Sequence, residues 1–160
     1  MASYLGATLQ SLLAYESWKV EIDWKGPDGE GQWQGPLLSA FLANGAYCGG
    51  GMWIGRGGTM HDGCLDLTML PPTHLVRTLS ETWRLYEGSA WKATGAQRVR
   101  VQSLQARSLE EERPVLLDVD GEQPGCLPIA VEVLPSALQV RGGWITSPLL
   151  EKSSQDWRPQ

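Results

Sequence analysis

The sequence predicts a mainly β fold of the α+β class, in which two sheets pack as a β-sandwich and two helices accompany them. Short segments with alternating apolar and polar residues recur along the 160 residues, and this period of two is typical of half-buried strands. Nineteen glycines and ten prolines separate these segments, as in the turns of β-rich proteins. Strands and helices do not alternate along the chain, which argues against a parallel βαβ sheet.

One domain is expected over residues 1–145, followed by a polar tail at 146–160. Globular domains average about 100–200 residues. A chain of this length buries enough apolar surface to fold without disulfides or a structural metal. The sequence has no internal repeat and no linker that would divide it into two domains.

Both helices are predicted from apolar residues that recur on one face. Over residues 3–15, Ser3 is a suitable N-cap, and the apolar face consists of Leu5, Leu9, Leu12 and Leu13. Over residues 74–87, two prolines at 71–72 end the preceding strand and Thr73 is a suitable N-cap. The apolar stripe of this second helix consists of Leu75, Leu79, Trp83 and Tyr86.

The clearest strand covers residues 18–24, where Trp18, Val20, Ile22 and Trp24 alternate with charged residues. A glycine-rich turn over 25–31 then predicts a hairpin whose return strand starts at 32–34. The continuous apolar run at 36–43 predicts a strand buried on both faces. The other strands are expected at 64–70, 98–106, 115–119, 127–134 and, briefly, 138–140.

The charge balance limits the classes of partner. Thirteen Lys and Arg against eighteen Asp and Glu leave a net charge of −5. Nucleic-acid binding is not expected, because the sequence has no basic stripe, and attraction to an anionic membrane would require a local patch. The eight tryptophans are expected mainly in the core, with a lipid-facing rim as the alternative for some of them.

The cysteines and the N-terminal residues indicate a cytoplasmic protein. Cys48, Cys64 and Cys126 are widely spaced and form no Cys-x-x-Cys motif, so we expect reduced thiols rather than a zinc site or disulfides. Residues 1–15 lack the pattern of a secretory signal. No apolar run approaches the roughly 20 residues that span a bilayer.

Three turn segments contain more glycines and carboxylates than a plain scaffold requires. The first, residues 44–52, includes Gly49, Gly50 and Gly51, which permit close backbone approach to a ligand or, equally, tight packing between strands.

A hydrolase triad is not supported, because neither His61 nor His74 has a Ser or Cys partner at a motif spacing.

The other two segments each have a structural and a functional interpretation. Asp62 forms an Asx turn with the glycine after it, or supplies one carboxylate ligand to a hard cation. Asp120 and Glu122 flank a glycine in a hairpin turn, or form a carboxylate pair in which one member is a general base. From the residues alone the turn is favoured in both segments, because a lone carboxylate makes a poor cation site and Asp-Gly is a strong hairpin signal.

These segments, in this order, resemble the C-terminal domain of the diacylglycerol kinase family of lipid kinases, which includes the bacterial YegS-like lipid kinases and the sphingosine and ceramide kinases. The matching runs are N-G-A-Y-C-G-G-G-M (44–52), H-D-G-C-L-D-L (61–67) and L-D-V-D-G-E-Q-P-G-C-L-P (117–128). The runs at 12–22 and 131–140 also fit, so the resemblance covers residues 3–142. It implies the C-terminal lobe of the NAD kinase and diacylglycerol kinase-like fold.

The resemblance implies transfer of the γ-phosphate of ATP to a lipid hydroxyl, such as that of diacylglycerol. The family binds nucleotide on an N-terminal lobe with a Gly-Gly-Asp-Gly-Thr-type loop, and this sequence has no such run. We therefore expect ATP to bind mainly to that separate lobe and this chain to be inactive by itself. The implied partners are a lipid alcohol, the N-terminal lobe and, peripherally, a membrane. The alternatives are a non-catalytic lipid-binding domain and the lobe of a sphingosine, ceramide or other alcohol kinase.

The resemblance also implies roles for individual residues. Glu122 matches the presumed general base and Asp120 its partner. A structural Mg²⁺ is implied at the Asp-Gly turn, with the Asp62 side chain and the carbonyls of Thr59 and Cys64 as ligands. His61 and Cys64 depart from the residues that are usual in this turn.

Overall fold

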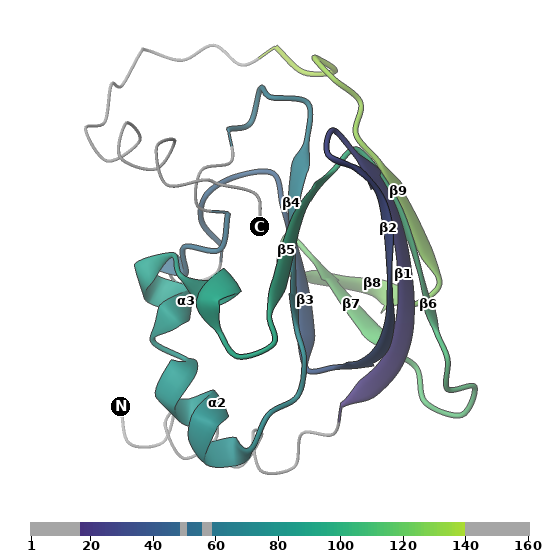
Figure 1. Cartoon of the computed structure of the whole chain (residues 1–160). Helices are drawn as coiled ribbons and strands as arrows, with labels where there is room; N and C mark the ends of the chain where they lie inside the picture. The colour runs from purple at the N-terminus through teal and green to yellow at the C-terminus, as the bar shows by residue number, and fades with distance from the viewer. Residues whose placement is uncertain (1–16, 49–50, 56–58, 140–160) are drawn as a thin grey trace.

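Two antiparallel sheets pack face to face in the computed structural model, which describes residues 17–48, 51–55 and 59–139 (Figure 1). The first sheet has the order β2-β1-β6-β9 and the second the order β3-β4-β5. The first consists of β1 (Trp18–Gly26), β2 (Gly29–Leu37), β6 (Ser103–Ser108) and β9 (Ile129–Glu132). The second consists of β3 (Ser39–Ala43), β4 (Leu65–Leu70) and β5 (Gln97–Val101). The predicted β-sandwich is confirmed.

A two-stranded ribbon and three short helices complete the described part of the chain. The ribbon consists of β7 (Leu116–Val119) and β8 (Glu122–Cys126). The helices are α2 (Leu75–Glu81), α3 (Arg84–Glu87) and the 3-10 helix η2 (Ala90–Lys92), on the side of the second sheet that faces away from the first (Figure 1). None of the helices in the described ranges is long and apolar enough to cross a membrane.

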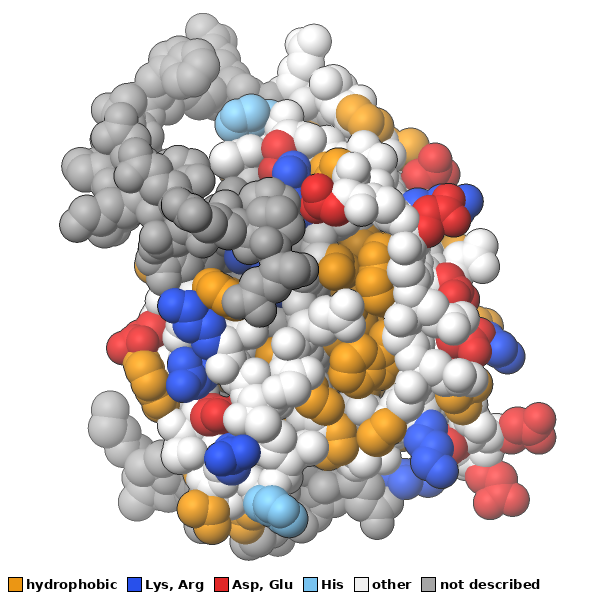
Figure 2. All heavy atoms as spheres, in the orientation of Figure 1, with side chains coloured by type: hydrophobic (Ala, Val, Ile, Leu, Met, Phe, Trp, Pro, Cys, Tyr) orange, Lys and Arg blue, Asp and Glu red, His pale blue; other side chains and the backbone are white. Residues whose placement is uncertain are grey.

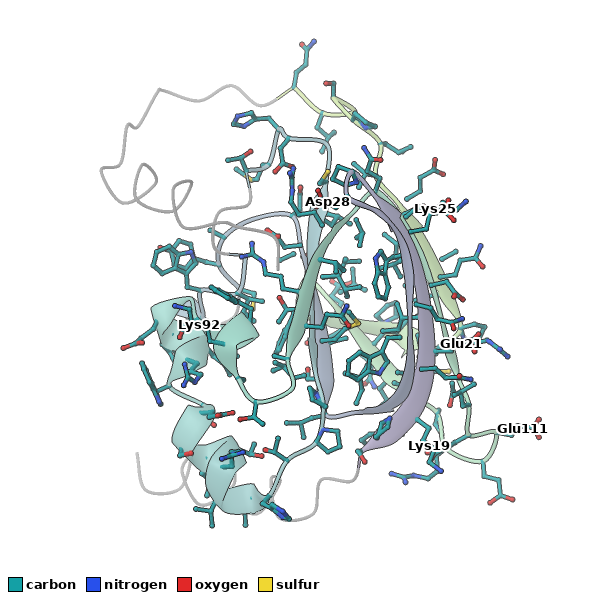
Figure 3. All side chains as sticks on the ribbon, in the orientation of Figure 1. Lys19, Glu21, Lys25, Asp28, Lys92 and Glu111 are labelled. Carbon is teal, nitrogen blue, oxygen red and sulfur yellow. The ribbon has the colours of Figure 1, made fainter. Side chains whose placement is uncertain are left out.

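The core fills the space between the two sheets. The first sheet contributes the inward residues of β1, as the alternation over 18–24 predicts, and Lys19 and Glu21 point away from the second sheet (Figure 3). The second sheet contributes the inward residues of β4 and β5. Full burial of one such aliphatic side chain stabilises the fold by about 1.5–3 kcal/mol. The buried core residues are Val20, Ile22, Trp24, Leu37, Leu67, Met69, Val101, Leu104 and Ala106.

Two predicted strands turn out to be corners at which the chain changes sheets. The run at 36–43 ends β2 at Leu37 and starts β3 at Ser39, so the expectation of one strand buried on both faces is wrong. The run at 98–106 divides in the same way at Gln102. At each corner a backbone N–H bonds across: Leu38 donates to the Leu70 carbonyl at 2.8 Å and Gln102 to the Lys25 carbonyl at 2.7 Å. Corners of this kind let one chain serve both layers of a sandwich.

The predicted helix over 74–87 is present in two pieces, and its apolar stripe faces outward. Thr73 does not cap it: His74 is the N-cap residue, and Thr73 Oγ1 instead lies 2.9 Å from Thr78 Oγ1. Leu79, Trp83 and Tyr86 are all exposed, so the stripe does not pack on the core.

Two further predictions of strands differ from the structure, and several predictions concern residues that the structure does not describe. Residues 122–126 form a strand, β8, that the sequence did not predict. Residues 138–139 are not in a strand. The predicted helix at 3–15, the polar tail at 146–160, and Gly49 and Gly50 lie outside the described residues.

Candidate functional site

Asp120 and Glu122 lie at the tip of the β7–β8 hairpin. Asp120 (φ 53°) and Gly121 (φ 88°) both have positive φ, the conformation that a two-residue hairpin turn of this hand requires. Asp118 Oδ1 accepts a hydrogen bond from the Gly121 N–H at 2.9 Å and holds the turn. The structure therefore contains the hairpin turn that the Asp-Gly pair predicts.

The fold leaves both candidate carboxylates open to solvent. Asp120 and Glu122 are exposed, and within the described ranges neither side chain has a hydrogen-bond or ion-pair partner. A carboxylate used for hairpin stability would bond to the turn, as Asp118 does. Both groups are thus available to a substrate or to another part of a larger protein.

The glycine-rich segment lies beside this hairpin. Cys48 and Met52 form a bridge with N–H to O distances of 2.9 and 3.0 Å. Burial raises the pKa of the Cys48 thiol, and the nearby charge of Asp118 raises it further. The segment at 44–52 and the β7–β8 hairpin, which the sequence analysis singled out separately, are therefore neighbours. Gly51, with φ 94°, has open space where a side chain would be.

The third segment is a turn closed by Asp62. Its Oδ1 accepts from the Cys64 N–H at 3.0 Å and its Oδ2 from the Thr59 N–H at 3.5 Å. The Asp62 N–H donates to the Thr59 carbonyl at 3.2 Å. Arg100 Nη2, on β5, lies 3.2 Å from Asp62 Oδ2 and forms an ion pair with it. These contacts are those of an Asx turn with an arginine partner.

The one carboxylate of this turn is shared with an arginine. The guanidinium of Arg100 neutralises Asp62, so Mg²⁺, which requires near-octahedral oxygen ligands, would have to compete with it. The described ranges contain no group of three or more His, Cys, Asp or Glu side chains that would hold a metal. Thr59, Asp62 and Cys64 remain a prediction of the sequence resemblance, and no step below depends on a metal there.

A buried ion pair that the sequence analysis did not single out lies next to this turn. Arg98 donates from Nε and Nη2 to Asp66 Oδ1, at 3.2 and 2.7 Å. Burial raises the pKa of the Asp66 carboxyl, and the charge of Arg98 opposes that rise. Charged and apolar residues alternate in β4 and β5, which places Asp66 and Arg98 on the face of the sheet that points away from the core. This alternation was the sequence signal from which the ion pair could have been predicted.

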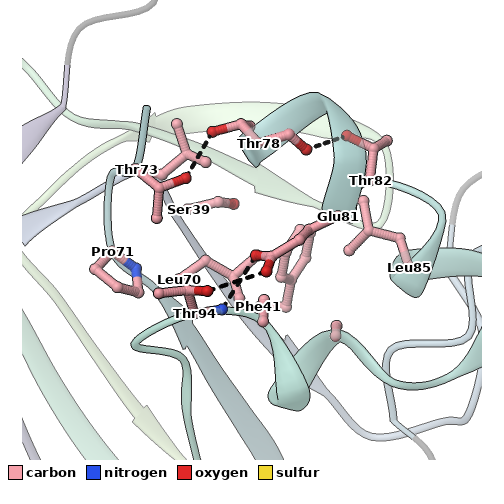
Figure 4. Close-up of a pocket in the computed structure, with 13 residues that line it drawn as sticks. Ser39, Phe41, Leu70, Pro71, Thr73, Thr78, Glu81, Thr82, Leu85 and Thr94 are labelled. Carbon is pink, nitrogen blue, oxygen red and sulfur yellow. Dashed lines mark hydrogen bonds between the residues drawn. The ribbon is translucent and has the colours of Figure 1, made fainter. Parts of the chain in front are cut away.

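An apolar pocket lies between the second sheet and helix α2 (Figure 4). Its volume is about 280 Å³, just under the range of about 300–1,000 Å³ that is typical of ligand sites. Glu81 lies at its polar edge, where it accepts from the Thr94 N–H and hydroxyl at 3.1 and 3.0 Å. These bonds lower the pKa of Glu81, the backbone bond most strongly. The apolar lining residues are Leu38, Phe41, Leu70, Pro71, Leu85, Ala90 and Ala93.

The sequence analysis missed this pocket, because it followed the other face of the helix. Thr78, Thr82 and Leu85 recur at spacings of four and three and face the sheet, but their mixed polarity resembles a solvated face. Asp120 and Glu122 do not line the pocket. The structure thus contains an apolar pocket and an exposed carboxylate pair as separate features.

Comparisons with known proteins place this architecture in a family. Residues 1–142 match the model of the YegS C-terminal NAD kinase beta sandwich-like domain. A probable lipid kinase YegS-like protein of Pectobacterium atrosepticum is 28% identical over 142 residues, which cover 88% of this chain and 43% of that protein. A protein of the same description from Stenotrophomonas maltophilia is 29% identical over 110 residues, covering 68% of this chain and 34% of that protein. The chain therefore spans less than half the length of these relatives.

Solved structures support the same fold. A diacylglycerol kinase from Bacillus anthracis str. Sterne superposes with a TM-score of 0.61 at 20% identity, over 82% of this chain and 42% of that one. A putative diacylglycerol kinase from the same organism gives a TM-score of 0.59 at 21% identity, over 81% and 41% of the two chains. At these identities the likeness concerns the fold alone.

Proposed function

Because the chain belongs to the family of YegS C-terminal NAD kinase beta sandwich-like domains, we propose that it is the acceptor-side domain of a lipid kinase. In this proposal the complete enzyme transfers the γ-phosphate of ATP to the hydroxyl of a membrane lipid such as diacylglycerol. The observation that carries the proposal is the exposed carboxylate pair Asp120 and Glu122, which the hairpin presents and the fold does not use.

The proposed chemistry needs one base on the acceptor side. A lipid hydroxyl is a weak nucleophile, and Glu122 would accept its proton as the new O–P bond forms and the bond between the γ-phosphorus and the bridging oxygen of ADP breaks. Asp120, two residues away on the same turn, adds negative charge that favours proton uptake by Glu122. ATP and its magnesium would be held by a separate nucleotide-binding lobe, as the resemblance implies.

The apolar pocket under α2 supports a lipid acceptor. Its lining is mostly aliphatic, and its volume of about 280 Å³ suits one stretch of alkyl chain better than a whole lipid. Glu81 and the surrounding threonines would keep polar groups at its edge. The pocket would anchor part of the acceptor while its hydroxyl reacts elsewhere.

The test is turnover of the chain joined to the nucleotide-binding lobe of a family member, with labelled ATP and diacylglycerol. Glu122→Gln keeps the shape and removes the basic carboxylate, so we expect kcat to fall by about 10²–10⁴-fold with KM for ATP nearly unchanged. Glu132→Gln, on the exposed side of β9, is the matched control and should be silent. Asp120→Asn should also slow turnover. Wild-type turnover in Glu122→Gln would remove the proposed base.

A non-catalytic lipid-binding domain is the second candidate, because residues of this chain alone form the apolar pocket. It predicts that the isolated chain binds a fluorescent diacylglycerol, that Phe41→Asp abolishes this binding, and that the joined protein does not turn over. Turnover that requires Glu122 would exclude it.

A further inference from the structure

Helices α2 and α3 expose the side chains that an amphipathic helix normally buries. Four residues at spacings of three and four form one stripe along them, here called the helix stripe: Val76, Leu79, Trp83 and Tyr86. They are 79%, 45%, 49% and 59% exposed. Figure 2 shows hydrophobic side chains among both basic and acidic ones over this region of the surface.

The opposite side of the same helices is committed to the fold. Thr78, Glu81 and Leu85 face the pocket and the second sheet, and Glu81 bonds to Thr94. Turning the helices to bury the stripe would therefore break these contacts. The apolar side of α2 and α3 is thus available to something outside the described fold.

Basic residues accompany the helix stripe. The guanidinium of Arg84 lies 5.3 Å from the centre of the Trp83 ring, and the ammonium of Lys92 lies 5.0 Å from the Trp91 ring. Arg77 is exposed on α2, and Lys92 lies beside the helices in Figure 3. The acidic residues of this segment are Glu81, which bonds to Thr94, and Glu87. Over residues 75–92, which include η2, three basic and two acidic residues leave a net charge of +1, in a chain of net charge −5.

An aromatic pair from another part of the chain lies against α3. The Trp53 N–H donates to the Leu85 carbonyl at 2.7 Å, and the Trp53 ring stacks on Tyr47 at a centroid distance of 5.6 Å. Tyr47 is exposed. Aromatic rings with a polar atom suit the boundary between lipid headgroups and acyl chains.

We propose that the helix stripe docks on the surface of a membrane that contains anionic lipids. Exposed aliphatic and aromatic residues flanked by Arg and Lys match the boundary of such a membrane in both polarity and charge. The inference extends the proposed function, since it would bring the pocket under α2 next to the bilayer that holds the acceptor, but its test needs no catalysis.

Co-sedimentation of the 160-residue chain with vesicles provides the test. We expect binding to phosphatidylcholine vesicles that contain phosphatidylserine, and much weaker binding to phosphatidylcholine alone. One basic residue near an anionic surface strengthens binding about fivefold, so Arg77→Glu should weaken binding by on the order of tenfold. Lys19→Glu, on the outer side of β1, is the matched charge control and should have a smaller effect.

A double variant and a control test the apolar residues of the helix stripe. Val76→Ser with Tyr86→Ser should weaken vesicle binding several-fold without lowering the melting temperature, since both side chains are exposed. Leu134→Ser, at an exposed leucine beyond β9, is the control. Equal binding by the stripe variants and the control would overturn the proposal. A lower melting temperature in the stripe variants would show that the chain itself covers the stripe, and loss of a dimer would show that a second copy does; either result also overturns it.

The experiments distinguish a failure of membrane docking from a failure of the proposed kinase function. A chain that does not bind vesicles still supports the kinase proposal if the joined enzyme phosphorylates detergent-dispersed diacylglycerol through Glu122. A chain that binds vesicles through the stripe supports the docking surface even if Glu122→Gln is silent.

Discussion

Arg98 Nη2 lies 2.7 Å from Asp66 Oδ1, and the two side chains are only 10% and 5% exposed. The pair lies on the side of β4 and β5 that faces away from the core. Two charges removed from water in this way favour folding only while they remain paired.

We therefore expect Arg98→Met or Asp66→Leu alone to lower the free energy of unfolding by about 3–5 kcal/mol, because each removes one member of a buried ion pair and leaves the other charge in a desolvated place. The double variant should recover most of that loss. Urea denaturation measures all three. The exposed pair Lys25 and Glu30, at 2.9 Å, is the control: Lys25→Met should cost less than about 1 kcal/mol. Additive losses in the double variant would show that Asp66 and Arg98 do not act as a pair.

The bonds from Thr94 make stability depend on pH through Glu81. They lower the pKa of this carboxyl below its usual 4.5, so the stabilisation is complete above pH 4.5 and is lost as pH falls through the lower folded pKa. Melting curves below pH 4.5 should show a smaller acid-induced drop for Glu81→Gln than for the wild type. Glu87→Gln, on the neighbouring helix, should retain the wild-type drop.

Gly26 cannot take a side chain, because it ends β1 against the backbone of β5. A Cβ at Gly26 would overlap the carbonyl oxygen of Arg100, and backbone cannot move aside as a flexible side chain does. Gly26→Ala should therefore cost about 1–3 kcal/mol or more, as measured by urea denaturation. Gly45→Ala is the control, since a Cβ there has no neighbour within 4 Å. Equal stability of the two variants would contradict this close approach.

Mg²⁺ should not raise the melting temperature of the chain, because Arg100 occupies the Asp62 carboxylate. A ligand stabilises only the state that it binds. Asp62→Ala should melt lower than the wild type to the same extent with and without Mg²⁺, since it loses the turn bonds to Cys64 and Thr59. A magnesium-dependent rise in the wild type that is absent in Asp62→Ala would show instead that the ion displaces Arg100. Arg100→Gln should then bind it more tightly.

The sequence predicted local structure well where local pattern decides it. Alternation in β1 identified Val20, Ile22 and Trp24 as core residues, and Asp120-Gly121 identified a hairpin turn. The corners at Leu38 and Gln102 were not predictable in this way, because their bonds go to Leu70 and Lys25, far away in the sequence.

Periodicity located helix within residues 74–87 but did not show which side of it faces the fold. It finds the apolar side of a helix but does not tell whether the protein core or another surface covers that side. Here Thr78 and Leu85 face the fold and Val76 and Trp83 face outward. At the candidate site, the turn closed by Asp62 was predicted, but Asp118 as the residue that holds the β7–β8 turn was not. The ion pairs of Asp62 and Asp66 with β5 depend on strand register between distant segments.

The β7–β8 hairpin is closed at its base by a bond from the Leu127 N–H to the Val115 carbonyl, at 2.9 Å, and these two residues pack against the core. Within the described ranges its strands pair only with each other. The hairpin therefore projects from the sandwich, and the position of its tip depends on the contacts that the tip makes. A base must lie within about 3 Å of the proton that it accepts, so in the proposed enzyme the neighbouring lobe would have to immobilise the hairpin before Glu122 is effective. Amide hydrogens over residues 116–126 should exchange rapidly in this chain and slowly once such a lobe is docked. Glu122 would then become an effective base only when the two lobes dock. ATP would therefore not react before the acceptor side is in place.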